Sequence, residues 1–273
     1  MLAFPDLTVD GSYTLGGGTT AVLIVAGIHP FLATLAAIGV GLCAGLVTGL
    51  LNTKLRLPAL LAGILMMVGL YSINLRVMSG ANVSLLREVT TFDKVAGFLG
   101  LSSGSIEVSI IVALVIAVIV FLVLNWFLRT EIGLALRATG DNEQMVRGLG
   151  VNTDMTTILG VSVANGLVAL AGAVVAQGQG FADVGMGIGM IVMGLASVII
   201  GESLFRPRGV ARLLVAAIGG AFVYRLFITI ALRLGMAPGD LKLITAVLVI
   251  IALAIPYIQK KLRHEWMPPA VRW

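Results

Sequence analysis

The sequence predicts an all-α, polytopic transmembrane helical bundle of about eight spans, and three observations support this class. Of the 273 residues, 59% are hydrophobic and only 11% are charged, whereas soluble domains carry about 25% charged residues. Six runs of 17 or more residues contain no Asp, Glu, Lys or Arg, and about 17–25 apolar residues cross a bilayer as a helix. The basic residues lie between these runs, as is typical of membrane proteins.

The long uncharged runs predict seven of the spans, and a further apolar stretch that contains Arg225 predicts the eighth. The first long run is divided by "GIHP", a turn-forming cluster that ends at Pro30. All spans belong to one predicted transmembrane domain, residues 1–273, and the polar start "PDLTVDGS" predicts no signal peptide. The expected spans are Gly11–Gly27, Pro30–Leu51, Pro58–Leu75, Val108–Leu128, Met155–Ala176, Val184–Gly201, Leu213–Leu232 and Leu243–Tyr257.

The distribution of basic residues predicts the orientation of the spans. When the loops are assigned to alternate sides, one side receives twelve Lys and Arg residues and the other receives five. Arg225 alone falls inside a predicted span. Because cytoplasmic loops carry the excess of basic residues, the first side is predicted to be cytoplasmic, together with both termini.

Composition also argues against several classes of function. The net charge of +5 comes from residues dispersed at span ends, which does not indicate nucleic-acid binding. Cys43 lies in an apolar run and is expected to be a packing residue, and His29 and His264 have no ligand-like companions, so no metal site is predicted. The chain has no GxxxxGK[ST] loop. We therefore expect a protein that is not an enzyme and holds no cofactor of its own.

Glycine spacing predicts close helix packing. Gly41, Gly45 and Gly49 recur every four residues, as do Gly185 and Gly189. Small residues on one face let helix backbones approach closely in lipid. Packing is favoured over a role in substrate binding.

A compact polar stretch, Arg137–Thr153, interrupts the apolar sequence on the predicted cytoplasmic side. Glu143 and Arg147 are four residues apart and can pair on a short helix. Asp141 or Asn142 could cap its N-terminus, and Gly148 or Gly150 could end it. Such a helix suits contact with a cytoplasmic partner, but an ordinary solvated loop is an equal alternative on these residues alone.

Three separated motifs carry a resemblance to a known family. The stretch "GLALRATGDNEQMVRGLGVNT", followed by an apolar span and "GQGF", resembles the permease subunits of bacterial ABC importers. The branch is that of the branched-chain amino-acid and ribose permeases, with a type II-like fold. The stretches "FPDLTVDGSYTLGG" and "LLAGILMMVGLYSINLRVMSG" are similar to a subgroup found beside tryptophan/tyrosine-type binding proteins. Such permeases usually have a further span before the first of these stretches.

The resemblance implies several partners: a second permease copy, cytoplasmic ATPase subunits that use ATP and Mg, and an extracytoplasmic substrate-binding protein. The polar stretch is then expected to form the inner gate or an ATPase contact, with Arg137, Asp141, Asn142, Glu143 and Arg147 as its residues. The main coupling element is expected in "GESLFRPRGVAR", with Glu202, Arg206, Pro207 and Arg208. Pro207 suits a first helical turn, and the arginines suit an acidic groove.

Polar residues inside spans are costly and therefore mark candidate pathway residues. For Asn165, interhelical hydrogen bonding is the alternative. For Arg225, the alternative is an anchor that reaches the interface with its charged end. The polar entrance of the first span is either a broken helix beside the pathway or an interfacial cap. The pathway candidates are Asn74, Asn165, Arg225, Asp10, Ser12 and Tyr13, and the outer-gate candidates are Gln177, Gln179 and Asp183.

With these features, the resemblance implies the transmembrane permease of an ATP-driven importer in the bacterial cytoplasmic membrane. The expected substrate is a small polar solute, with an amino acid first and a sugar or nucleoside second. A secondary transporter is the rival class, and it predicts carboxylates within the spans, which the uncharged runs lack. A membrane-embedded enzyme would require clustered His, Asp or Glu at one depth.

Overall fold

The computed structural model describes residues 4–100, 102, 104–205, 209–235, 243, 245–247 and 250 of the chain. Within this part, α-helices dominate and two short strands form a single antiparallel pair. The chain divides into two compact units, Met1–Met190 and Ile191–Trp273. The first unit contains α1 to α8 and both strands, and the second contains most of α9 and all of α10.

Five predicted spans are confirmed as helices that are long and apolar enough to cross a bilayer, and their bounds agree with the predictions to within three residues. The α-helix satisfies the backbone hydrogen bonds within the segment, as lipid requires, and few charged residues interrupt these sequences. These helices are α2 (Pro30–Thr53), α3 (Ala59–Val77), α5 (Ile106–Phe127), α8 (Thr153–Gln179) and α10 (Val210–Arg233).

The other three predicted spans have different outcomes. The helix α1 covers Thr8–Val25, so it begins three residues earlier than expected and includes Asp10. The helix α9 covers Met190–Phe205 and has only 16 residues, because the predicted start of its span at Val184 is irregular. The span predicted at Leu243–Tyr257 lies largely outside the described residues. A count of eight spans is therefore not established.

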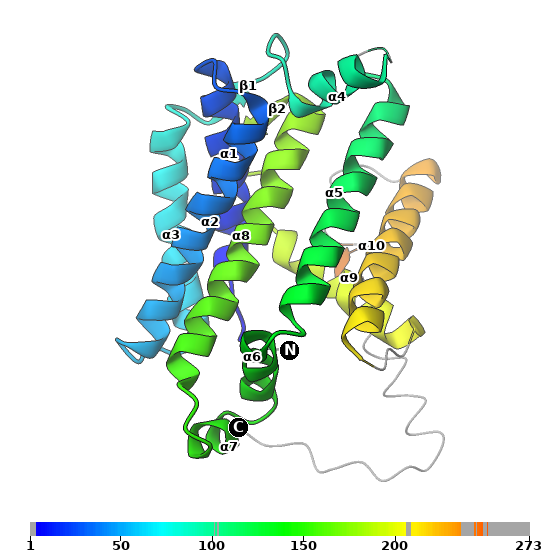
Figure 1. Ribbon diagram of the computed structural model, residues 1–273. Coiled ribbons are helices and arrows are strands. Elements are labelled where there is room, and N and C mark those ends of the chain that lie inside the picture. Colours follow the sequence, from blue (N-terminus) through cyan, green and yellow to red (C-terminus); the bar gives the residue numbers. More distant parts are fainter. Residues whose placement is uncertain are drawn as a thin grey trace. The chain divides into compact units, whose positions relative to one another are not determined.

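Glycine-lined contacts hold α1 and α2 against α8, and these three helices lie side by side with α3 (Figure 1). A Cβ atom built on Gly41 would lie 2.6 Å from the carbonyl oxygen of Asn165, and one on Gly45 would lie 2.5 Å from that of Val161. Only glycine permits backbones to approach this closely, so the packing role predicted for this stripe is confirmed.

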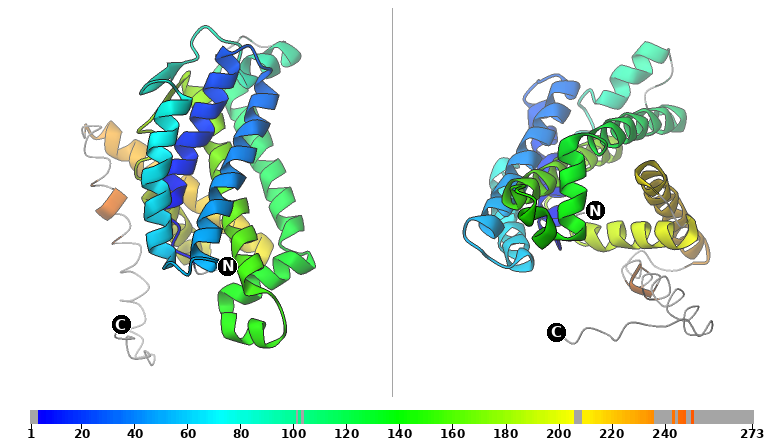
Figure 2. Two further views of the ribbon diagram at one scale, coloured as in Figure 1. Left: turned by 90° about the vertical axis from the view of Figure 1, so that its left-hand side faces the viewer. Right: turned by 60° about the horizontal axis from the view of Figure 1, so that its bottom comes forward.

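The two ends of the first unit carry different structures. At one end lie the short helices α6 (Glu131–Asp141) and α7 (Glu143–Gly148), and we call this the α7 end. At the other lie α4 (Thr91–Leu99) and the strands β1 (Asn82–Ser84) and β2 (Phe181–Asp183), paired with Asn82 opposite Asp183. The left view of Figure 2 shows the same separation. The basic residues assigned to the cytoplasmic side in this unit belong to the α7 end.

A glycine-rich segment, residues 184–189, follows β2 as irregular backbone that packs along α1. The amide of Gly187 donates to Thr14 Oγ1 at 3.1 Å, and that of Gly189 donates to Asp10 Oδ2 at 2.9 Å. A Cβ atom on Gly187 would overlap the Asp10 carbonyl, and Gly189 has φ +90°. The helix predicted from Val184 therefore begins only at Met190, and the predicted helical stripe of Gly185 and Gly189 is wrong. Gly187 instead allows the close approach to α1, and Gly189 adopts a left-handed turn.

The close contact between α1 and α8 predicts opposite effects of alanine at two helical glycines. A Cβ atom on Gly16 would lie 2.0 Å from the Ala169 carbonyl oxygen, whereas one on Gly39 would meet nothing within 4 Å. Gly16→Ala should therefore destabilise the fold by about 1–3 kcal/mol through overpacking. Gly39→Ala should be neutral or stabilising by up to about 1 kcal/mol, because alanine is the better helix former. Thermal unfolding in detergent measures both, and equal midpoints would contradict this packing.

Candidate functional site

The polar stretch at the α7 end forms the predicted short helix, and asparagine side chains cap the starts of α7 and α8. Asn142 caps α7, its Oδ1 accepting from the amide of Met145 at 3.0 Å. Gly148 ends the helix, and Gly150 follows with φ +84°. Glu143 and Arg147 form the predicted pair, with 2.6 Å between Oε1 and Nη2. The short capped helix is therefore confirmed.

An ion-pair cluster connects α7 to α8 and to the end of α2. Arg147 donates from Nε and Nη2 to Thr153 Oγ1, at 3.2 and 2.9 Å. The carboxylate of Asp154 lies 3.9 Å from Arg147 and 3.8 Å from Lys54. These side chains are exposed, so each pair contributes at most about 1 kcal/mol to stability. The cluster is suited to fixing relative position rather than to supplying stability.

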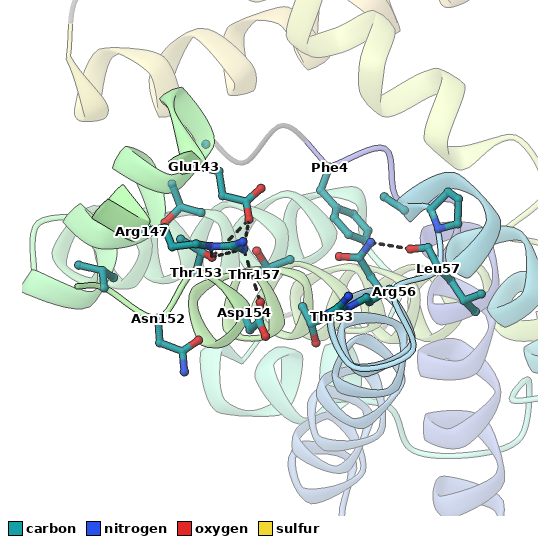
Figure 3. A pocket seen from close by; sticks show the side chains of 16 residues that line it. Phe4, Thr53, Arg56, Leu57, Glu143, Arg147, Asn152, Thr153, Asp154 and Thr157 are labelled. Atoms are coloured by element: carbon teal, nitrogen blue, oxygen red, sulfur yellow. Dashed lines mark hydrogen bonds and ion pairs between the residues drawn. The ribbon is translucent and has the colours of Figure 1, made fainter. Parts of the chain in front are cut away.

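A cavity of about 950 Å³ opens beside this cluster, and it is lined by four parts of the first unit. These are the N-terminal residue Phe4, the α2–α3 connection, the end of α6 with α7, and the start of α8. Figure 3 shows Arg147 and Glu143 on one wall, Arg56 and Leu57 on the other, and Asp154 between them. Asn52 supports the second wall by donating to the Leu57 carbonyl at 2.8 Å.

A buried polar seam joins α1 to α8 deeper in the bundle. Ser12 donates to Asn165 Oδ1 at 2.7 Å, and Asn165 Nδ2 donates to the Asp6 carboxylate at 2.6 Å. Both Ser12 and Asn165 are fully buried. Asp6 also accepts from the amide of Thr8 at 2.9 Å, so its carboxylate ties the start of α1 to the middle of α8. Tyr13 lies next to the seam and is buried.

The outer-gate candidates lie at the β1–β2 end but do not share one environment. Gln177 is buried; its Oε1 accepts from the amide of Thr91, and its Nε2 donates to Thr34 Oγ1, both at 2.9 Å. Gln179 is exposed and donates to the carbonyl of Phe181. Asp183 accepts from the amide of Gly185 at 2.7 Å. Gln177 thus bridges α2, α4 and α8, whereas the other two fix the turn around β2.

The remaining candidates are scattered. Asn74 is buried and donates to the Gly11 carbonyl at 3.2 Å, while its Oδ1 has no partner among the described residues. Arg137 donates to the Leu128 carbonyl at 3.4 Å, and Asp141 is exposed at the end of α6.

In the second unit, Glu202 and Arg225 are exposed on α9 and α10. Arg206, Pro207 and Arg208 lie outside the described residues. Their proposed roles in coupling, and that of Arg225 in the pathway, stay predictions.

Several residues at the α7 end were missed by the sequence analysis. Phe4, Arg56, Thr153 and Asp154 meet at the cavity only because three distant segments fold together. One local signal existed, since "NTKLRLP" carries two cations directly after an apolar span. Within the described residues, no group of three or more His, Cys, Asp or Glu side chains could hold a metal ion.

Comparison with known proteins agrees with this architecture. A family model described as the branched-chain amino acid transport system / permease component matches residues 1–254. A tyrosine transport system permease protein of Clostridioides difficile is 45% identical over 254 residues, which cover 93% of this chain and 82% of the relative. An uncharacterised protein of Rickettsia prowazekii is 33% identical, over 93% of this chain and 88% of its own length.

More distant relatives are matched over a smaller part. A galactofuranose transporter permease protein of Escherichia coli is 29% identical over 63% of this chain and 48% of the relative. No solved structure matches the chain. The family model covers most of the sequence, and five helices can cross a bilayer. The chain is a multi-pass membrane protein and belongs to the permease family of the branched-chain amino acid transport system, as a transport subunit of ABC importers.

Proposed function

We propose that this permease carries a free amino acid into the cytoplasm, with tyrosine and related aromatic amino acids as the first candidates. The observation that carries the proposal is the 45% identity to a tyrosine transport permease over 93% of the chain. A sugar is a candidate because a galactofuranose permease is also similar to the chain. It comes second because that relative matches only 63% of the chain.

The α7 end is proposed to face the cytoplasmic ATPase subunits, which bind ATP and Mg. Met145 and Leu149 are 64% and 72% exposed beside the charged pair of Glu143 and Arg147. Exposed apolar side chains surrounded by charge are typical of a protein interface. The main coupling element was expected at Glu202–Arg212; we now favour α7, because it combines apolar anchors with a fixed position on α8.

The other two expected partners are a binding protein and a second permease copy, and the first is assigned to one end of the first unit. An extracytoplasmic binding protein would deliver the solute to the β1–β2 end, and a second permease copy would complete the pathway. The glycine face of α2 is covered by α8 of the same chain. We therefore propose that the second copy packs on other exposed apolar faces rather than on this one.

Uptake driven by ATP distinguishes this proposal from an ion-driven transporter. The distinction is needed because Asp10 lies within α1 and the Asp6 carboxylate reaches Asn165 near the middle of α8. Both carboxylates accept hydrogen bonds from fixed partners, which favours a structural role.

The full complex in proteoliposomes is expected to accumulate tyrosine only with ATP and the binding protein. Omitting either component is the control. Accumulation that follows a proton or sodium gradient without ATP would contradict the proposal, and uptake of a sugar alone would favour the second candidate.

The proposed ATPase contact predicts the effect of charge on α7. Met145→Glu and Leu149→Glu should weaken copurification of the ATPase at least tenfold, because a buried interface anchor is replaced by an unpaired carboxylate. Phe98→Glu on α4, which is 90% exposed at the opposite end, is the matched control and should leave association unchanged.

Variants of the loop Glu202–Arg212 show which result would contradict the α7 contact. If the α7 variants bind the ATPase normally while charge reversal at Arg206 and Arg208 abolishes binding, the main contact lies in Glu202–Arg212 instead.

A further inference from the structure

The cavity at the α7 end contains a cation that has no partner among the described residues. Arg56 lines its wall, yet its guanidinium makes no hydrogen bond or ion pair there. Its backbone has φ +54°, a left-handed conformation that glycine or asparagine adopts more readily than arginine. Strained residues of this kind concentrate at functional sites. An arginine held at this position suggests that its side chain is needed in the cavity.

A second lining residue, Asp154, has a carboxylate that can accept further hydrogen bonds, and it lies between the two walls of the same cavity (Figure 3). Asp154 pairs with Lys54 and Arg147 only at 3.8–3.9 Å, and its carboxylate accepts no hydrogen bond from any described residue. Glu143 differs, because its Oε1 already accepts from Arg147 and Thr153. Asp154 can therefore accept hydrogen bonds from a guest that carries an ammonium group.

The charges of the lining indicate the class of guest. The lining carries two cations, Arg56 and Arg147, and two carboxylates, Glu143 and Asp154, so it is neutral overall. An anion such as a phosphate would meet two carboxylates, and a simple amine would meet two cations. A zwitterion complements both kinds of charge at once, because its carboxylate can pair strongly with a guanidinium and its ammonium group with a carboxylate. Phe4 and Leu57 add apolar surface beside Arg56.

We propose that this cavity is a product site for a free amino acid, with the carboxylate on Arg56 and the ammonium group on Asp154. The volume of about 950 Å³ accommodates tyrosine together with water. Because Asp154 also pairs with Arg147 of α7, an occupied site competes for the carboxylate that links α8 to α7. Accumulated cytoplasmic amino acid would therefore act on the helix proposed to face the ATPase. The inference rests on the proposed function for its choice of guest.

Protection of a cysteine tests the site without requiring transport. Thr157 lines the cavity, and Gln144 is exposed on α7 outside it. Thr157→Cys and, as the control, Gln144→Cys are made in a Cys43→Ala background and alkylated in inside-out vesicles. Tyrosine should slow alkylation at position 157 at least tenfold and leave position 144 unchanged. Tyramine lacks the carboxylate, and 3-(4-hydroxyphenyl)propionate lacks the ammonium group. Each should need at least a tenfold higher concentration than tyrosine to give the same protection of position 157.

Substitutions test which residue binds each charged group of the amino acid. Arg56→Gln and Asp154→Asn should each raise the tyrosine concentration for half-protection at least tenfold. Arg56→Lys should raise that concentration less, because it keeps the positive charge. Arg56→Gly is a second variant that relieves the left-handed backbone while removing the cation, and it should behave as Arg56→Gln. Equal protection by tyrosine and tyramine, or none by tyrosine, would overturn the product site even if the complex imports tyrosine. Protection without tyrosine uptake would instead count against the proposed function.

Discussion

The backbones of α1 and α2 approach that of α8 closely, and the first unit is built on this contact. The buried face of α8 consists mostly of small residues, and Asn165 and Gln177 are its two buried amide side chains. Because lipid offers no hydrophobic driving force between helices, close van der Waals packing and interhelical hydrogen bonds must supply the attraction. The glycines on α1 and α2 make this approach possible, and Asn165 then reaches Ser12 and Asp6.

Both ends of the first unit are built outward from α8. At the α7 end, Thr156 and Thr139 bring their hydroxyl oxygens to 3.1 Å, which fixes α6 on α8, and Thr153 bonds to Arg147 of α7. At the β1–β2 end, Gln177 ties α8 to α2 and to the start of α4. One continuous helix therefore connects the end proposed to receive the solute with the end proposed to meet the ATPase. A displacement at either end can reach the other through α8.

Local sequence patterns predicted the helices and the α7 cap, but not the contacts between distant segments. Apolar composition over about 20 residues is enough to predict α2, α3, α5, α8 and α10, although α10 includes Arg225. The irregular segment 184–189 escaped prediction because its apolar glycines resemble a span by composition, although φ +90° at Gly189 breaks the helix. The Asp6–Asn165 bond joins residues 159 positions apart. Likewise, only the fold brings Arg56 and Asp154 to one cavity.

If the ATPase binds α7 as proposed, the contacts of α6 and α7 with α8 imply that the three helices move as one body and that the ATPase acts directly on the helix that spans the unit. A disulfide between Thr139→Cys and Thr156→Cys, in a Cys43→Ala background, would fix α6 to α8 where the native hydroxyl oxygens are 3.1 Å apart. The oxidised complex is expected to retain ATP-driven uptake in proteoliposomes at the rate of the reduced complex. Loss of uptake on oxidation, with recovery on reduction, would show that α6 must move against α8 and would contradict the account.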